Sequence, residues 1–179
     1  MNSRVHQFVF IVIGLLGVIN CTFSSPINDV REVFFKASYD YNAFLELKEL
    51  LNENRLEGHV PINAYRAAFK VLTAKYTVNT FDKIRLVYTG LDELNELIKL
   101  NNNDLELRFL RFALEYHIPN VLFLSKHLKS DKLFILDNVS RIKLMDVNSL
   151  FKEDLLIFIE ETGHFSSDEK QLIRQNIFQ

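Results

Sequence analysis

Residues 80–100 carry the pattern that most restricts how this chain can fold. Apolar side chains recur there at intervals of three and four residues, at Ile84, Val87, Leu91, Leu94 and Ile98. This spacing places them along one face of an α-helix. Such a face indicates either coiled-coil dimerisation or, for so short a seam, packing against another helix of the same chain. Gly90 costs roughly 1 kcal/mol relative to alanine in a helix and marks a kink or a close helix contact.

The rest of the chain follows the same helical pattern. Only 5 glycines and 3 prolines occur among 179 residues, and neither strand alternation nor an Asn-Gly or Asp-Gly hairpin signal is present. Nine stretches have helical periodicity: 27–38, 43–54, 62–76, 80–100, 103–117, 121–128, 131–145, 149–162 and 166–178. The pattern is less clean from residue 120 onward, so the number of helices expected is slightly smaller. The predicted fold is all-α, an antiparallel array of about seven to eight helices that is tetratricopeptide-like or α-solenoid-like. A single helical domain is expected over residues 26–179.

Local signals refine three of these helices. The stretch 62–76 is rich in alanine, which lets a neighbouring helix approach closely, so we expect it to lie between other helices. Ser166 and Glu169 form a capping box for the last helix, and Asn103 with Glu106 makes a similar start for the helix that ends near His117.

Residues 1–25 read as an export signal that does not belong to the fold. Arg4 precedes an apolar run from Phe8 to Ile19, and small and polar residues follow. The run fits a signal-peptide core and is short for a membrane span of about 20 residues. Cleavage after Ser24 is the first interpretation, and it predicts an exported protein of the periplasm or cell envelope.

Two further interpretations of this segment stay open. Cys21, the single cysteine of the chain, follows Val18-Ile19-Asn20 in a sequence that resembles a bacterial lipobox and is then a lipidation site. Asn20 fits poorly, because a small residue normally stands before that cysteine. The segment can also remain as an uncleaved anchor. Contact with a membrane is expected only through this lipid or anchor.

The charge of the chain argues against nucleic-acid binding, and its cysteine content excludes an internal disulfide. The chain has 21 basic and 23 acidic residues, a formal net charge of −2, and no run of basic residues. Nucleic-acid binding is therefore not expected, because it depends on clustered lysine and arginine. A domain without a second cysteine cannot form an internal disulfide, so its core must stabilise it.

No catalytic, metal or cofactor motif is recognisable. The histidines beyond the signal segment, at 59, 117, 127 and 164, form neither His-Glu-x-x-His nor His-x-x-x-His. Gly-x-Ser-x-Gly and phosphate-binding glycine loops are also absent. The acidic pairs Asp92-Glu93, Glu153-Asp154 and Glu160-Glu161 resemble glycosidase carboxylates, yet neighbours on a helix point about 100° apart. No catalytic residue, metal or cofactor is predicted, and an enzyme is the less favoured class.

The helix after the asparagine-rich turn holds the candidate binding residues. On a helical wheel Arg108 and Arg111 lie in a narrow polar strip, whereas Glu106 falls inside the apolar arc and needs a partner if it is buried. Two arginines one turn apart suit a peptide C-terminus or a phosphate. In the alternative interpretation Glu106 caps its own helix, and the arginines tie helices together or are solvated. Asp104 with Arg108 and Arg111 with Glu115 are also spaced as i,i+4 pairs that can support the helix.

Two resemblances add to this reading. Leu94 to Ala113, with the Asn101-Asn102-Asn103 turn, resembles the junction between tetratricopeptide repeats, without a period of 34 residues. Ala64-Tyr65-Arg66-Ala67-Ala68, Ala74-Lys75-Tyr76, Glu106 to Arg111 and His117-Ile118-Pro119 resemble uncharacterised exported proteins of Bacteroidota-type bacteria. The second resemblance implies a bacterial envelope location. The function expected is a non-catalytic protein- or peptide-binding scaffold, with an envelope hydrolase as the alternative.

Overall fold

Eight α-helices make up the part of the chain that the computed structural model describes, namely residues 26–53, 58–144 and 149–178. They are α1 (Pro26–Ala37), α2 (Tyr41–Leu51), α3 (Val60–Tyr76), α4 (Thr80–Leu100), α5 (Leu105–His117), α6 (Leu128–Asp137), α7 (Ser149–Glu161) and α8 (Ser167–Phe178). Two short 3-10 turns, η2 (Asn120–Leu122) and η3 (Val139–Leu144), flank α6. No described residue lies in a β-strand, so the all-α prediction is confirmed.

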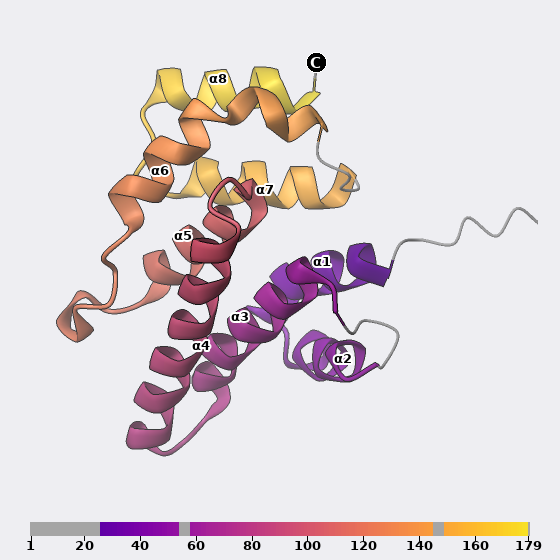
Figure 1. Cartoon of the computed structure of the whole chain (residues 1–179), viewed down its shortest axis with the longest axis vertical. Coiled ribbons are helices and arrows are strands. Elements are labelled where there is room, and N and C mark those ends of the chain that lie inside the picture. The colour runs from indigo at the N-terminus through magenta and orange to yellow at the C-terminus, as the bar shows by residue number, and fades with distance from the viewer. Residues whose placement is uncertain (1–25, 54–57, 145–148, 179) are drawn as a thin grey trace, which may run out of the picture.

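Helices α3 and α4 form a tightly packed antiparallel pair (Figure 1). At Gly90 an added Cβ would lie 2.5 Å from the backbone oxygen of Ala67 and 2.7 Å from Cγ2 of Val71. Glycine is therefore required for the approach, and the predicted close contact is confirmed. The apolar seam of α4 is buried at Val87 and Leu91, so the described chain itself provides the packing partner for that seam.

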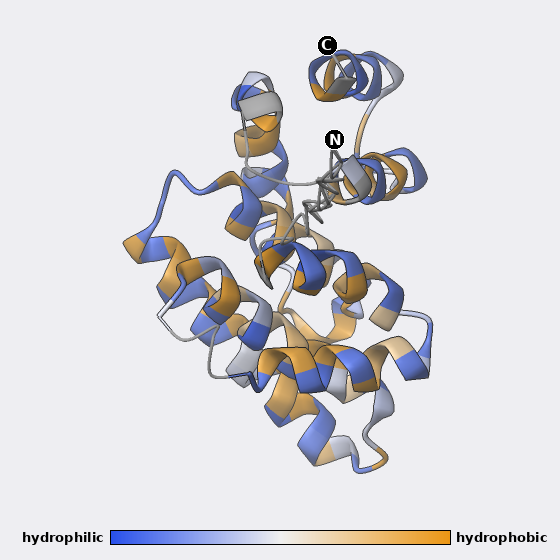
Figure 2. Cartoon of the chain, turned by 90° about the vertical axis from the view of Figure 1, so that its right-hand side faces the viewer, coloured by the Kyte–Doolittle hydropathy of each residue, from blue (hydrophilic) through white to orange (hydrophobic). Residues whose placement is uncertain are grey.

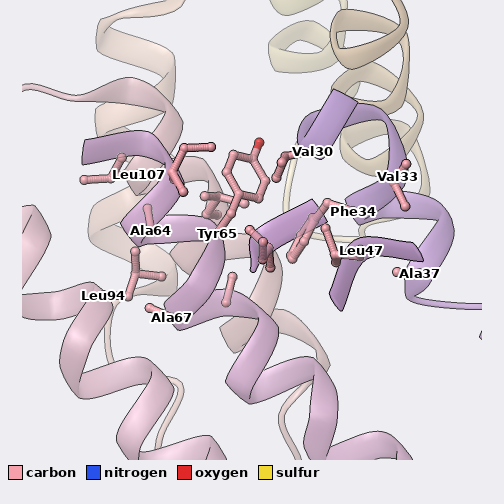
Figure 3. Packing of buried hydrophobic residues seen from close by; sticks show 14 of the residues in the cluster. Val30, Val33, Phe34, Ala37, Leu47, Ala64, Tyr65, Ala67, Leu94 and Leu107 are labelled. Atoms are coloured by element: carbon pink, nitrogen blue, oxygen red, sulfur yellow. The ribbon is translucent and has the colours of Figure 1, made fainter. Parts of the chain in front are cut away.

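Helix α5 lies between two hydrophobic clusters. Leu107 and Leu110 belong to an N-terminal cluster with α1 to α4, whereas Phe109 and Phe112 belong to a C-terminal cluster with α6, η3, α7 and α8. Figure 3 shows the first cluster, in which Tyr65 of α3 lies among apolar side chains of α1, α2 and α5. A helix buried on most of its circumference is a core element, so any charge on it needs an internal partner.

The C-terminal helices gather at the end of the molecule opposite the α3–α4 tip (Figure 1). Figure 2 shows hydrophobic and hydrophilic residues alternating along each of these helices. Buried hydrophobic residues of these helices form the C-terminal cluster. The predicted capping box of α8 is confirmed, because the Ser166 backbone N–H donates to Glu169 Oε2 at 2.7 Å and Ser166 Oγ accepts from the Glu169 N–H at 3.3 Å.

The prediction of a helix over residues 121–128 is wrong. After η2 the chain turns at Phe123, which has φ 53° and ψ 30°, a left-handed conformation that is rare for a bulky residue. Hydrogen bonds to Glu115 hold this segment in place of helical ones. The Glu115 backbone oxygen accepts from Ser125 Oγ at 2.8 Å, and its carboxylate accepts from the His127 backbone N–H at 2.7 Å. The next helix therefore begins only at Leu128.

The start of α5 also differs from the prediction. Asp104, not Asn103, is the N-cap residue, and its Oδ1 accepts from the backbone N–H groups of Glu106 and Leu107 at 2.9 and 3.1 Å. An aspartate in this position also carries a charge that suits the positive end of the helix dipole. The Glu106 side chain is thereby released for tertiary contacts.

None of the helices in the described ranges combines the length and the apolar character needed to cross a membrane. The predicted export signal and Cys21 fall within residues 1–25, which lie outside the described residues.

Candidate functional site

Glu106 occupies a buried ion cluster that joins α1, α3 and α5. The Arg31 guanidinium donates from Nε to Oε1 at 2.8 Å and from Nη2 to Oε2 at 2.7 Å. The Tyr65 hydroxyl donates to Oε1 at 2.9 Å. We call Arg31, Tyr65 and Glu106 the closed cluster, because all three side chains are buried. The partner that a buried carboxylate was expected to need is therefore present.

Burial has a measurable consequence in the closed cluster. Removal from solvent raises the pKa of Tyr65 well above its usual value, and the neighbouring Glu106 carboxylate raises it further. The phenol therefore stays protonated and donates its hydrogen bond over the whole neutral range. The closed cluster thus contains one cation, one anion and one hydroxyl donor, each with a partner in the core.

Arg108 and Arg111 are brought together by Asp131 of α6. Arg111 donates from Nε to Oδ2 at 2.7 Å and from Nη2 to Oδ1 at 2.6 Å, and Arg108 donates from Nη1 to Oδ1 at 3.0 Å. The Asp131 side chain has no exposed surface. We call Arg108, Arg111 and Asp131 the open cluster, because the Arg108 side chain remains 21% exposed. The sequence reasoning missed Asp131, because a buried aspartate is favoured only beside its cationic partners, and the approach of α6 to α5 is a tertiary feature.

The i,i+4 ion pairs considered for α5 do not form, because each carboxylate has another use. Asp104 caps the helix. Glu115, whose side chain is 1% exposed, accepts from His127 Nδ1 at 2.7 Å as well as from the His127 backbone N–H. Both carboxylate oxygens of Glu115 thus hold the segment before α6 against α5.

The two arginines of the open cluster line a surface groove with a volume of about 580 Å³. We call it the α4–α5 groove. Helix α4 lines it with Asp92, Asn95 and Lys99, and the turn that follows adds Asn102. Asn95 joins the two walls, because its Oδ1 accepts from Arg111 Nη1 at 2.8 Å. A concave site with a few convergent polar groups is the usual setting for ligand binding.

The opposite wall is basic. Arg108 and Arg111 line it from α5, and Lys126 and His127 line it from the segment before α6. Two of the three sequence-predicted site residues therefore share the groove. Glu106 does not line it and faces Arg31 instead. The sequence offered no signal for Lys126 or His127, because their approach to α5 depends on the non-helical path after Phe123.

The histidines are separated. His127 contacts Glu115, whereas the His117 ring packs edge-on against Tyr116 and Phe158. Burial lowers the pKa of His117, and the positive charge of Lys75 acts in the same direction. Across the described ranges no group of three or more His, Cys, Asp or Glu side chains is arranged to hold a metal ion.

Comparison with known proteins identified no similar protein. No family model matches the chain, and no match was found among curated proteins or solved structures.

Proposed function

We propose that this protein is a non-catalytic binding module that accepts an extended peptide segment of a partner protein in the α4–α5 groove. The observation that supports this proposal is the groove itself. It has a volume of about 580 Å³ and is lined by α4, α5 and the segment before α6. That volume lies within the range of sites that bind small ligands, roughly 300–1,000 Å³, and suits a few peptide residues. Asparagine side chains on the α4 wall offer the amide groups that recognise a peptide backbone.

The groove is held in shape before any ligand arrives. Asn95 ties the α4 wall to Arg111, and Asp131 ties α5 to α6. Glu115 fixes the backbone of His127. Prior fixation of a site lowers the entropy that binding must overcome, which supports a binding role.

We further propose that residues 1–25 export this module to the cell envelope of a bacterium. There it is either a cleaved, soluble protein, a lipoprotein attached through Cys21, or a protein held by the uncleaved segment. The architectural part of the proposal is a tetratricopeptide-like array, in which stacked helix pairs present a surface to extended partners. The close antiparallel pairing of α3 and α4 supports it.

Peptide binding is tested with acetylated pentapeptide pools randomised at every position. Chemical-shift changes in a ¹H–¹⁵N NMR spectrum should concentrate on amides of Asn95, Lys126 and His127. Asp92→Trp, which fills the groove from an exposed site, should remove these changes. Thr89→Trp is the matched control, because Thr89 is an exposed residue of the same helix outside the groove lining and should leave binding intact.

Shift changes spread evenly over the surface, or equal loss in both tryptophan variants, would contradict a peptide site in the groove. Location is tested separately by mass spectrometry of the mature N-terminus after expression of the full chain in a bacterium. A free Ser25 supports cleavage, a lipidated Cys21 supports the lipoprotein form, and accumulation of unprocessed chain in the cytoplasm contradicts the envelope proposal.

A further inference from the structure

The charges of the open cluster do not balance. Asp131 is the shared anion of two guanidinium groups, with Arg111 as its bidentate partner and Arg108 as its second donor. One positive charge is therefore left over beside a carboxylate that has no exposed surface. An uncompensated charge that is largely withdrawn from water is costly, and an anion in the adjoining groove would lower that cost.

Arg108 keeps unused donors at the groove wall. Its Nε is buried without a hydrogen-bond partner among the described residues, and Nη2 reaches only the Asn102 backbone oxygen, at 3.4 Å. The guanidinium lies 4.8 Å from the centre of the Phe134 ring, which holds its plane in place. Each Nη group has two N–H donors, so hydrogens beyond those given to Asp131 and Asn102 remain on a guanidinium whose position is fixed.

A second cation, Lys126, belongs to the same basic wall of the groove. Lys126 lines the groove, and within the described ranges its ammonium makes no ion pair or hydrogen bond. Its backbone is held by the Leu124 carbonyl, which accepts from the Lys126 N–H at 3.0 Å, and the flanking residues are tied to Glu115. By contrast, Lys99 already pairs with Glu96 at 2.5 Å. The uncompensated charge is thus concentrated on Arg108 and Lys126.

The rest of the groove restricts which anion fits. Asp92 lies on the α4 wall one turn before Asn95, so it repels a ligand that is acidic along its length. The Asn95 side-chain nitrogen, whose partner oxygen accepts from Arg111, is placed to donate to a carbonyl. A monoanionic group at one end and an uncharged or basic chain toward Asp92 match this distribution.

We infer that the α4–α5 groove recognises the C-terminal α-carboxylate of a peptide, with Arg108 and Lys126 as the residues that bind it. This assignment rests on the proposed peptide-binding function and specifies its ligand. Arg111 and Asp131 act as positioning residues, because their bidentate pair fixes the guanidinium of Arg108 through the shared carboxylate. A carboxylate suits this pair of cations, because hydrogen bonds from a guanidinium and an ammonium to an ionised acceptor are charge-assisted.

The test compares two acetylated random pentapeptide pools, one with free C-terminal carboxylates and one with C-terminal amides. The free-acid pool should bind about tenfold or more tightly, the effect of losing a charge-assisted hydrogen bond. Equal binding of both pools would overturn this inference and leave the proposed function standing. Binding of neither pool would overturn the proposed function and the inference with it.

Two variants with matched controls identify the residues. Arg108→Gln should lower binding of the free-acid pool to the level of the amide pool and leave the amide pool unchanged, whereas Arg85→Gln, an exposed arginine of α4, should change neither. Lys126→Gln should weaken free-acid binding, and Lys129→Gln, exposed on α6, should not. Unchanged selectivity for the free acid in both groove variants would contradict the assignment.

Inorganic phosphate separates a carboxylate site from a general anion site. Because phosphate presents no chain to the Asn95 wall, it should displace the free-acid pool only at concentrations far above those of the peptide. Displacement at comparable concentration would show that any small anion satisfies Arg108 and Lys126, and would overturn recognition of a peptide terminus.

Discussion

The closed and open clusters place similar residues on the same helix and yet have different charge balance. In the closed cluster one arginine meets one glutamate through two hydrogen bonds, and the Tyr65 hydroxyl supplies a third donor to that carboxylate. In the open cluster two arginines share Asp131, and Arg108 reaches the surface. The closed cluster is balanced and buried, whereas the open cluster has an excess cation beside a groove.

This difference separates two roles that a charged residue on a buried helix can have. A balanced, buried pair holds three helices in register, so it is structural. A cluster with an excess cation beside a groove has N–H donors that can bind a ligand. Four variants, ordered by expected effect, test whether the two clusters differ in this way.

The largest loss of stability is expected from Glu106→Leu. Removing this carboxylate leaves the Arg31 guanidinium buried beside an apolar side chain, and breaking a buried pair costs about 3–5 kcal/mol. Urea unfolding followed by circular dichroism measures the change. Arg31→Met combined with Glu106→Leu should recover much of the loss. A double variant no more stable than Glu106→Leu alone would show that charge burial is not the reason.

Asp131→Asn should cost less, about 2 kcal/mol, although Asp131 is as deeply buried as Glu106. The amide retains an acceptor for Arg111, and the Arg108 side chain is already partly exposed to the solvent of the groove. The same unfolding experiment measures it. A loss equal to that of Glu106→Leu would mean that the two clusters are energetically alike, and the comparison would fail.

Tyr65→Phe should cost about 1.5 kcal/mol at neutral pH, the lower end for a hydrogen bond to a charged group, because Arg31 still holds the carboxylate. The cost should depend on pH. Since the folded pKa of Tyr65 is raised, its contribution is complete below the unfolded value of about 10 and is lost as pH rises above it.

The difference in unfolding free energy between wild type and Tyr65→Phe should therefore shrink above pH 10. Comparing the two proteins removes the effect of Tyr76, whose pKa is also raised, since it titrates in both. A difference that stays constant up to pH 11 would contradict burial of the phenol beside Glu106.

The smallest effect on stability is expected from Arg108→Gln, about 0.5 kcal/mol. Arg108 is partly exposed, and its removal leaves Arg111 and Asp131 as a balanced pair. The same variant should have the largest effect on free-acid peptide binding. A thermal shift assay with and without the peptide pools measures both. A large loss of stability would place Arg108 with the structural residues instead.

Local sequence patterns predicted much of the fold. The period of the apolar residues predicted residues 80–100 as one helix, and the structure has α4 over Thr80–Leu100. Gly90 was expected to mark a kink or a close contact, and the contact with Ala67 is there. These features depend on helix periodicity and on side-chain size, which can be read within a few turns of chain.

Prediction failed where distant residues compete with the helix. In the stretch 121–128, the hydrogen bonds from Ser125 and His127 to Glu115 replace helical ones. The inward face of the following helix is also set by distant residues, since Leu133 is 50% exposed whereas Asp131 is buried. An aspartate in a core is favoured only once its arginines are known to be nearby.

For the site, the sequence alone determined that α5 would carry two arginines one turn apart and a carboxylate on its apolar side. Helix periodicity is sufficient for that, because it depends only on neighbours along the chain. Only the tertiary structure decided that Glu106 faces Arg31, that one aspartate serves both arginines, and that Lys126 completes the groove. Those pairings join residues far apart in the chain, and their energies depend on burial and on charge balance, which exist only after the helices have packed.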